Sequence, residues 1–191
     1  MKEPFIKEGE YCRLRPMTLE DCENVISWRN RDRVRLEYIY MEKLTLEEEI
    51  RYFHDRVEAG KVWHFIICDK AHGDRGVGCQ VFNDVDEFLK DPENKMLEVG
   101  YFIGEEDALG TGIAIEGMRL GMHYAFDNYG AKVICSRIFT DNKRSIRACE
   151  KVGMHVTDTI PDVVRSDGTK KEMKLLTITK KDLEEAEKRD V

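Results

Sequence analysis

The chain has 191 residues, of which 31 are Lys or Arg and 38 are Asp or Glu, so its formal net charge is −7. A chain of this length can bury the core of one domain, and the acidic balance argues against a general nucleic-acid coat. The six cysteines include no Cys-x-x-Cys pair, which favours reduced thiols over a zinc site or a disulfide framework. No run reaches membrane-spanning length and residues 1–5 lack the apolar core of a signal peptide, so the sequence predicts a soluble, cytoplasmic protein.

The first half of the chain predicts a strand, two helices and two further strands. Polar and apolar residues alternate over 11–15, as is typical of a strand. Thr18 and Thr45 each begin a helix, because an acidic residue three positions later can complete a capping box. These helices are expected to run to Trp28 and to about Val57, with Gly60 ending the second. The runs 62–68 and 77–82 predict two strands, and the acidic stretch 83–94 is expected to be a loop or a short helix.

Strands and helices alternate in the second half. The run 96–103 is apolar, β-branched and aromatic and predicts a strand, and it is followed by a helix that ends at Tyr129 because Gly130 suits the C′ position. A strand over 133–139 and a helical block over 142–154 come next. Two strands, 154–160 and 173–178, and a charged helix that begins after Thr179 complete the prediction. No repeat or linker divides the chain, so a single domain is predicted over 1–191.

The segment between the strand 96–103 and its following helix is typical of a loop that binds phosphate. It reads Leu109, Gly110, Thr111, Gly112, Ile113 and Ala114. The two glycines have no Cβ atom, so an anion can approach the backbone, and the first N–H groups of the helix attract it. A plain tight turn is the alternative interpretation.

A second motif follows the strand 133–139 and contains Asn142, Ser145, Ile146 and Arg147, with Lys151 and Gly153 further on. Together the two motifs resemble the Gcn5-related N-acetyltransferase (GNAT) superfamily, in particular its branch of ribosomal-protein N-terminal acetyltransferases. In that branch a Gly-x-Gly-x-Ala loop precedes Asn-x-x-Ser-Ile-Arg and a later Lys-x-Gly-Phe. The resemblance implies an α/β (α+β) fold with a mixed, mostly antiparallel central sheet of about seven strands, flanked by helices, in which the fourth and fifth strands splay apart.

The resemblance also implies a binding site for acetyl-CoA between the splayed strands. The pantetheine amides would pair with the strand edge at Tyr101, Phe102 and Ile103, and the pyrophosphate would meet the N–H groups of 109–114. Leu109 stands where the family usually has Arg or Gln, which removes one side-chain contact. Asn142 and Ser145 would contact the pantetheine arm, although Asn142 is also a favoured helix cap. Lys143 and Arg147 would contact the 3′-phosphate, unless they form only a solvated basic face.

Transfer of an acetyl group to an amine requires a base for the ammonium and an acid for the departing thiolate. The family's usual acid is a tyrosine whose position is held here by Cys149, a residue type that is often part of a core. Ser145 matches the serine to which the ribosomal-protein branch assigns this role. The resemblance implies Glu98 on the strand 96–103 as the candidate base, because it matches the Glu-x-Gly-Tyr pattern of the same branch. A merely exposed strand glutamate is the alternative.

The segment Trp28, Arg29, Asn30, with Arg35 beyond it, is predicted to bind the acceptor. It looks like the Trp-Arg-Asn segment of the ribosomal-protein branch and of acetyltransferases that act on amino-sugar nucleotides. The two arginines would suit a carboxylate or phosphate on the acceptor. The structural alternative is that Asn30 ends the helix and Trp28 packs beneath it.

The sequence therefore predicts an acetyl-CoA-dependent N-acetyltransferase that acetylates a primary amine, either a protein N-terminus or a small molecule, by direct attack. The alternatives are an amino-sugar-nucleotide N-acetyltransferase and an acyl-CoA-binding sensor or partner module of the same fold. A dinucleotide-binding fold fits poorly, because its glycine-rich turn follows the first strand. No metal, membrane or nucleic acid is expected as a partner, and a homodimer is compatible with the resemblance.

Overall fold

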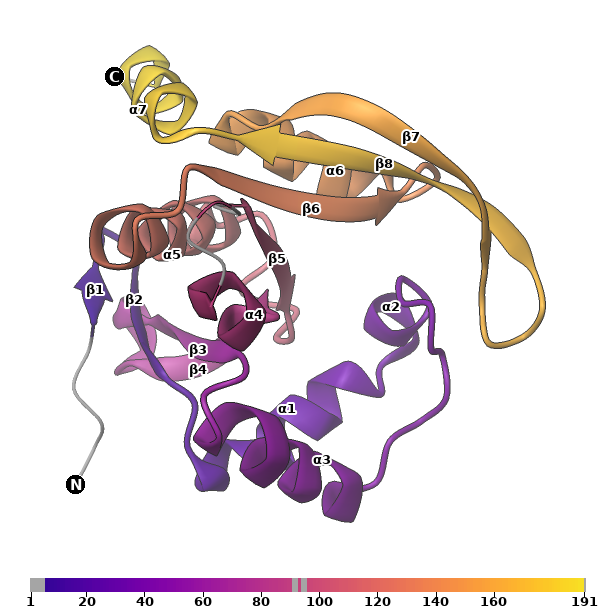
Figure 1. Cartoon of the computed structure of the whole chain (residues 1–191). Helices are drawn as coiled ribbons and strands as arrows, with labels where there is room; N and C mark the ends of the chain where they lie inside the picture. The colour runs from indigo at the N-terminus through magenta and orange to yellow at the C-terminus, as the bar shows by residue number, and fades with distance from the viewer. Residues whose placement is uncertain (1–5, 91–92, 94–95, 191) are drawn as a thin grey trace.

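The computed structural model describes residues 6–90, 93 and 96–190 and contains one eight-stranded sheet (Figure 1). Neighbouring strands in the order β1-β2-β3-β4-β5-β6-β8-β7 are antiparallel, except that β5 and β6 are parallel. The strands are β1 Lys7–Glu8, β2 Cys12–Pro16, β3 Trp63–Asp69, β4 Arg75–Asn83, β5 Met96–Ile103, β6 Val133–Phe139, β7 His155–Val164 and β8 Lys170–Ile178. The predicted mixed, mostly antiparallel sheet is confirmed; β1 is an additional short strand, and β8 lies between β6 and β7.

The helices begin and end largely where local signals place them. Thr45 and Thr179 form capping boxes with Glu48 and Asp182, and Gly130 ends the longest helix with a φ of 68°. A helical turn over Phe53–Glu58 continues α3, and the short turns Leu19–Asp21 and Lys70–His72 flank other elements. The helices are α1 Cys22–Arg29, α2 Asp32–Arg35, α3 Leu46–Tyr52, α4 Val85–Lys90, α5 Ile113–Tyr129, α6 Lys143–Val152 and α7 Lys180–Arg189.

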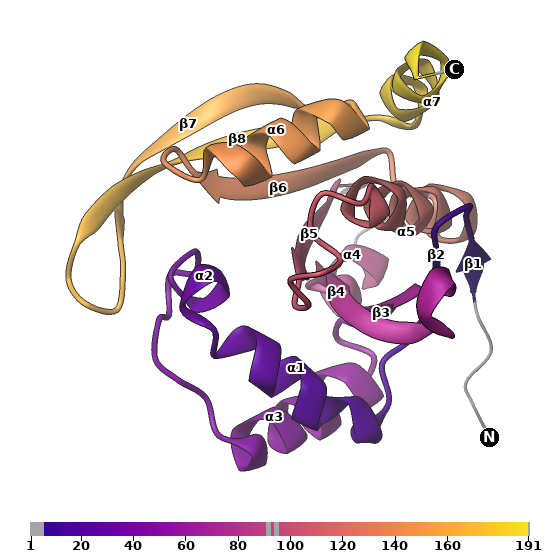
Figure 2. The ribbon, with the colours of Figure 1, turned by 180° about the vertical axis from the view of Figure 1, so that it is seen from behind.

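The two faces of the sheet are covered by different helices (Figures 1 and 2). Apolar residues of α5, α6 and α7, among them Met118, Ile146 and Leu183, share one buried cluster with the strands. Residues of α1, among them Val25 and Trp28, share another with β3 and β4. Burial of these apolar stripes drives the layers together, so α1 and α3 lie on the opposite face from the two helices whose N-termini carry the predicted phosphate contacts.

The hairpin formed by β7 and β8 is long, and its tip contacts the loop between α2 and α3 (Figure 2). The guanidinium of Arg165 donates to the Leu36 carbonyl at 2.6 Å, and the Ser166 N–H donates to the Ile39 carbonyl at 2.9 Å. The Ser166 hydroxyl accepts from the Met41 N–H at 3.1 Å. These contacts fix the loop that carries Tyr38.

Parts of two predictions fall outside the described residues. The stretch 83–94 forms α4, but positions 91, 92 and 94 lie outside them. Residues 1–5, from which the sequence predicts that there is no signal peptide, also lie outside the described residues. Within the described ranges, none of the helices is long and apolar enough to cross a membrane.

Candidate functional site

Strands β5 and β6 separate after a short paired stretch. Their parallel pairing covers Met96, Leu97 and Glu98, and beyond Glu98 strand β5 is paired with β4. The Gly104 N–H donates to the Val77 carbonyl at 2.7 Å. Backbone N–H and carbonyl groups alternate in direction along a strand. Those of Phe102 therefore also point towards β4, whereas those of Tyr101 and Ile103 point into the space between β5 and β6. The carbonyl of Ile103 accepts from Arg33 at 2.9 Å. In the predicted open edge at 101–103, the backbone groups of Tyr101 and Ile103 face away from β4. Phe102 is predicted to be part of this edge, but its backbone groups face β4.

The loop 109–114 lies at the N-terminus of α5, and its two glycines adopt a left-handed conformation. Gly110 has a φ of 79° and Gly112, the N-cap of the helix, has a φ of 92°. Leu109 packs against a buried cluster that includes Ile113, and Thr111 donates its hydroxyl to the Ala108 carbonyl at 2.8 Å. The first N–H groups of α5 have no carbonyl partner within the helix, so the loop presents donors where the helix dipole is positive.

Asn142 and Ser145 begin α6 on the other side of the splay. The Asn142 carboxamide oxygen accepts from the Ser145 N–H at 3.0 Å, so Asn142 is the helix cap. The Ser145 hydroxyl lies 3.3 Å from the Tyr101 hydroxyl, which reaches it from β5. Lys143 and Arg147 are exposed on the same helix. The structure thus places a pair of hydroxyl groups between the two strands where they diverge.

Cys149 follows Ser145 by one helical turn and belongs to the core. Its side chain is buried in the same cluster as Ile146. Burial raises the pKa of the Cys149 thiol to about 12, so the thiol stays protonated at neutral pH. Burial raises the pKa of Tyr101 as well.

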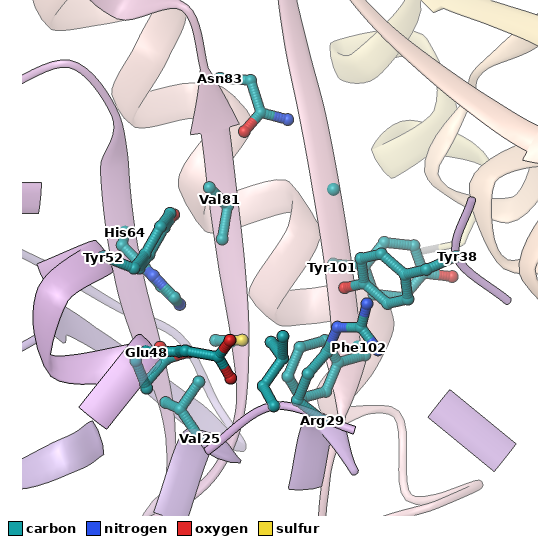
Figure 3. A pocket seen from close by; sticks show the side chains of 14 residues that line it. Val25, Arg29, Tyr38, Glu48, Tyr52, His64, Val81, Asn83, Tyr101 and Phe102 are labelled. Carbon is teal, nitrogen blue, oxygen red and sulfur yellow. The ribbon is translucent and has the colours of Figure 1, made fainter. Parts of the chain in front are cut away.

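A cavity of about 420 Å³ lies between α1, α3 and the strands β3, β4 and β5 (Figure 3). Figure 3 shows Arg29, Tyr38 and Phe102 at one side of the cavity and Tyr52 and His64 at the other. Its wall is largely aromatic and apolar and contains a few polar groups. The lining residues are Val25, Arg29, Tyr38, Leu44, Glu48, Glu49, Tyr52, His64, Cys79, Val81, Asn83, Gly100, Tyr101 and Phe102. Tyr101 belongs both to this wall and to the splay, so the cavity borders the residue whose hydroxyl lies beside Ser145.

Glu49 and His64 are among the buried titratable side chains of the cavity wall whose pKa values are strongly shifted. Burial raises the pKa of the Glu49 carboxyl to about 7, opposed by the positive charge of Arg29. Burial lowers the pKa of His64 to about 4, so its imidazole is neutral at pH 7. Oε1 of Glu49 and both ring nitrogens of His64 have no hydrogen-bond partner. Shifted titratable groups that converge on a cavity are a signature of functional sites.

Glu98, the predicted base, is held in an ion pair on the sheet. Its two carboxylate oxygens accept from the Arg137 guanidinium of β6 at 2.8 and 2.7 Å. It does not line the cavity, whereas Glu49 does. In the sequence Glu49 is one of three consecutive glutamates in the first turn of a helix, where acidic residues are common. The only sequence signal for Glu49 is its place on the side of the helix that also carries Ile50 and Phe53, which pack against the core.

Of the four residues predicted to bind the acceptor, Arg29 lines the cavity. Trp28 is buried beneath Gly104, and its indole N–H donates to Glu105 at 2.6 Å. The Asn30 carboxamide bonds to both backbone groups of Leu44, which closes the loop between α1 and α3. Arg35 donates to Asp32 and to the Met41 carbonyl. These last three side chains therefore stabilise the wall that holds Arg29.

The family model described as the acetyltransferase (GNAT) domain matches residues 12–155. This match covers the open edge, the glycine loop and the start of α6. The chain belongs to the GNAT acetyltransferase family. It is accordingly an N-acetyltransferase domain, for which acetyl-CoA is the co-substrate.

Solved GNAT structures share the fold at low sequence identity. A GNAT-family acetyltransferase from Bacillus anthracis is 19% identical, with 93% of this chain and 99% of that chain covered and a TM-score of 0.77. Mycobacterium smegmatis RimJ in complex with CoA-disulfide is 18% identical, with 90% and 83% covered and a TM-score of 0.74. Spermidine N-acetyltransferase from Vibrio cholerae, in complex with CoA and spermine, is 12% identical, with 92% and 99% covered and a TM-score of 0.80. The sequence matches no protein of curated function at a significant level.

Proposed function

We propose that this GNAT protein, acting as a single domain, transfers the acetyl group of acetyl-CoA directly to an amine that enters the cavity between α1, α3 and β3–β5. The observation that carries the proposal is the position of Tyr101. The backbone of Tyr101 lies on the open edge of β5, and its hydroxyl lies beside that of Ser145. Tyr101 also lines the cavity. A thioester on the open edge and an amine in the cavity would thus approach each other from two sides of one strand.

The residues around the splay suit acetyl-CoA. The N–H groups of 109–114 and the dipole of α5 would hold the pyrophosphate, and Gly112 leaves its backbone accessible. The backbone groups of Tyr101 and the N–H of Ile103 point into the splay and would pair with the pantetheine amides, whereas the Ile103 carbonyl accepts from Arg33. Asn142 and Ser145 would contact the same arm. The exposed side chains of Lys143 and Arg147 would contact the 3′-phosphate.

Acetyl transfer to an amine requires a proton acceptor and a proton donor from the protein. Acetyl-CoA supplies an activated acyl group. The amine must lose its ammonium proton before its lone pair can form the new C–N bond, and the C–S bond then breaks. Ser145 is the donor that protonates the departing sulfur, and Tyr101 is the hydroxyl that can replenish the Ser145 proton. Cys149 has no part in this scheme, because it is a buried core thiol.

The proposal is tested by incubating the protein with acetyl-CoA, a panel of primary amines and a thiol reagent that detects released CoA. Release of CoA that depends on the amine, together with the acetylated amine in the mass spectrum, is the expected result. Binding of acetyl-CoA without release for any amine would identify an acyl-CoA-binding sensor instead. Absence of binding in calorimetry would overturn the proposal altogether.

Gly112→Val is expected to weaken acetyl-CoA binding by roughly tenfold or more, because a branched side chain would cover the N–H groups that hold the pyrophosphate. Calorimetry on the folded variant measures this. Since Gly112 has a positive φ, any substitution there is also strained. Gly130→Val is the matched control, because Gly130 has a φ of 68° at the opposite end of the same helix. Equal affinities in the two variants would disprove the assignment of the loop.

Replacing Lys143 and Arg147 together by Ala is expected to remove the preference for CoA over dephospho-CoA. Both side chains are exposed on α6, so we expect a change of only a few-fold in affinity for CoA. Competition binding with the two nucleotides measures the ratio. The double variant Lys181→Ala, Lys188→Ala makes the same charge change on α7 and serves as the control. A preference that survives in the first variant would show that this basic face is only solvated.

A further inference from the structure

The cavity contains a buried carboxylate and a partly buried guanidinium, and no hydrogen bond joins them among the described residues. Glu49 is 5% exposed and its Oε1 has no partner, and Nη1 of Arg29 has none either. The positive charge of Arg29 lowers the pKa of Glu49, so the two groups are close enough to interact through space. A buried carboxylate oxygen and a buried guanidinium nitrogen without partners both lose hydration without compensation. Such an arrangement calls for a ligand that satisfies both.

A second buried carboxylate in the same region shows what a purely structural role looks like. Asp21 is 6% exposed and accepts two hydrogen bonds from Arg15, at 2.6 and 2.7 Å, and one from the Thr18 N–H at 2.8 Å. These bonds lower the pKa of Asp21 although burial opposes them. Glu49 is equally buried, but its Oε1 has no hydrogen-bond partner among the described residues. The difference indicates that the Glu49 carboxylate is kept available for a ligand.

Arg29 is held in place without using all its donors. Its guanidinium lies 3.6 Å from the centre of the Tyr38 ring, and Nη2 donates to the Tyr40 carbonyl at 2.9 Å. Burial lowers the pKa of Arg29, but a guanidinium keeps its charge at neutral pH. Nη1 therefore offers a fixed cationic donor. A carboxylate or a carbonyl oxygen would satisfy it.

On the basis of the proposed function, we infer that Glu49 binds the acceptor ammonium and takes its proton, while Arg29 binds a carboxylate next to the amine. The acceptor class is thus an α-amino acid or a molecule with the same amine and carboxylate arrangement. The aromatic wall of Tyr38, Tyr52 and Phe102 suits an apolar or aromatic side chain on that acceptor. The charged and titratable residues of the cavity wall, besides Glu49 itself, are Arg29, Tyr38, Glu48, Tyr52, His64, Cys79 and Tyr101.

The proton balance closes with groups that the protein holds. The Glu49 carboxylate takes one proton from the ammonium, and the freed amine nitrogen forms the C–N bond. The C–S bond breaks, and the sulfur takes a proton from the hydroxyl pair of Ser145 and Tyr101. The second proton of the amine nitrogen leaves as the amide forms and restores the hydroxyl pair. The net products are the acetylated amine, CoA with its thiol, and the proton on Glu49, which returns to solvent.

The substrate half of the inference is tested with phenylalanine, phenylalaninamide and phenethylamine. These probes share one body and differ in the group next to the amine. We expect kcat/KM of the wild-type protein to fall by roughly tenfold or more from phenylalanine to phenethylamine, with the amide in between. Arg29→Met should bring the three values within a few-fold of one another. If that variant fails to fold, Arg29→Lys should still narrow the range. Equal wild-type values for phenylalanine and phenethylamine would overturn the role of Arg29.

Glu49→Gln tests the other half. It should lower kcat/KM by about 10²-fold for every acceptor and leave acetyl-CoA affinity unchanged. Because burial raises the Glu49 pKa above its usual 4.5, the ionised group destabilises the folded protein above pH 7 and not at low pH. Glu49→Gln should therefore raise Tm at pH 8 more than at pH 5, so lost activity would not reflect unfolding. Glu47→Gln, an exposed neighbour on the same helix, is the matched control.

The outcomes separate this inference from the function on which it depends. If other amines are acetylated but none of the three probes is, the substrate class is wrong and the acetyltransferase remains. Activity retained by Glu49→Gln would remove Glu49 from the reaction in the same way. If the wild-type protein acetylates no amine at all, the proposed function itself fails.

Discussion

Ser145→Ala is expected to lower kcat by about 10²-fold and to change the Kd of acetyl-CoA by only a few-fold, because it removes a positioned proton donor. The Ser145 hydroxyl lies 3.3 Å from that of Tyr101, at the point where β5 and β6 diverge. Steady-state kinetics with saturating amine give kcat, and calorimetry gives the affinity for acetyl-CoA. Tyr101→Phe removes only the partner hydroxyl, so it should lower kcat in the same direction.

Two controls decide whether the hydroxyl pair acts as one unit. The double variant should be no slower than the slower single variant, because residues that act together are not additive. Cys149→Ala should leave kcat within a few-fold, since that thiol is a buried core group. A large loss in Cys149→Ala with normal Ser145→Ala, or an acetylated Cys149 during turnover, would show that the acid or the direct mechanism is misassigned.

Trp28→Ala is expected to cost about 3–5 kcal/mol of folding free energy, as large-to-small changes at buried aromatic residues do. Trp28 is 2% exposed, and a Cβ on Gly104 would lie 2.1 Å from its Cγ, so the indole fills the space beneath that glycine. The lost side chain would also leave Glu105 without the indole N–H. Denaturant unfolding followed by circular dichroism measures the change.

Tyr40→Ala is the control for this prediction, because the Tyr40 side chain is 74% exposed and little stability should be lost. From the sequence, Trp28 is predicted to bind the acceptor. Loss of acceptor binding would raise KM for the amine, whereas loss of a structural side chain would lower the free energy of unfolding. A Trp28→Ala protein of normal stability whose KM for the amine has risen would support acceptor binding and contradict the structural role.

Much of the backbone geometry at the starts of α5 and α6 could be predicted because its signals are local in the sequence. A glycine with positive φ at the start of α5, an asparagine cap at the start of α6 and a glycine at the end of α5 each depend on a few neighbouring residues. Hydrophobic periodicity likewise fixed the strands β5 and β6 and the helices that follow them. The mixed, mostly antiparallel sheet, which the resemblance to the GNAT superfamily implies, is confirmed.

The acceptor side depends on contacts between residues far apart in the chain. Tyr101 meets Ser145 across 44 positions, and Glu98 meets Arg137 across 39 positions. In the sequence Glu98 is a candidate base and Glu49 is one of several helix glutamates, but the register of β5 on β6 turns Glu98 to an arginine. The packing of α3 on α1 buries Glu49, whose Oε1 has no hydrogen-bond partner among the described residues.

The amino-acid sequence by itself determined where the helices α5 and α6 begin and present free N–H groups, because caps, left-handed glycines and helix dipoles are properties of short segments. Only the tertiary structure decided which carboxylate is ion-paired and which is left available, because burial and charge pairing depend on what each side chain meets across the fold.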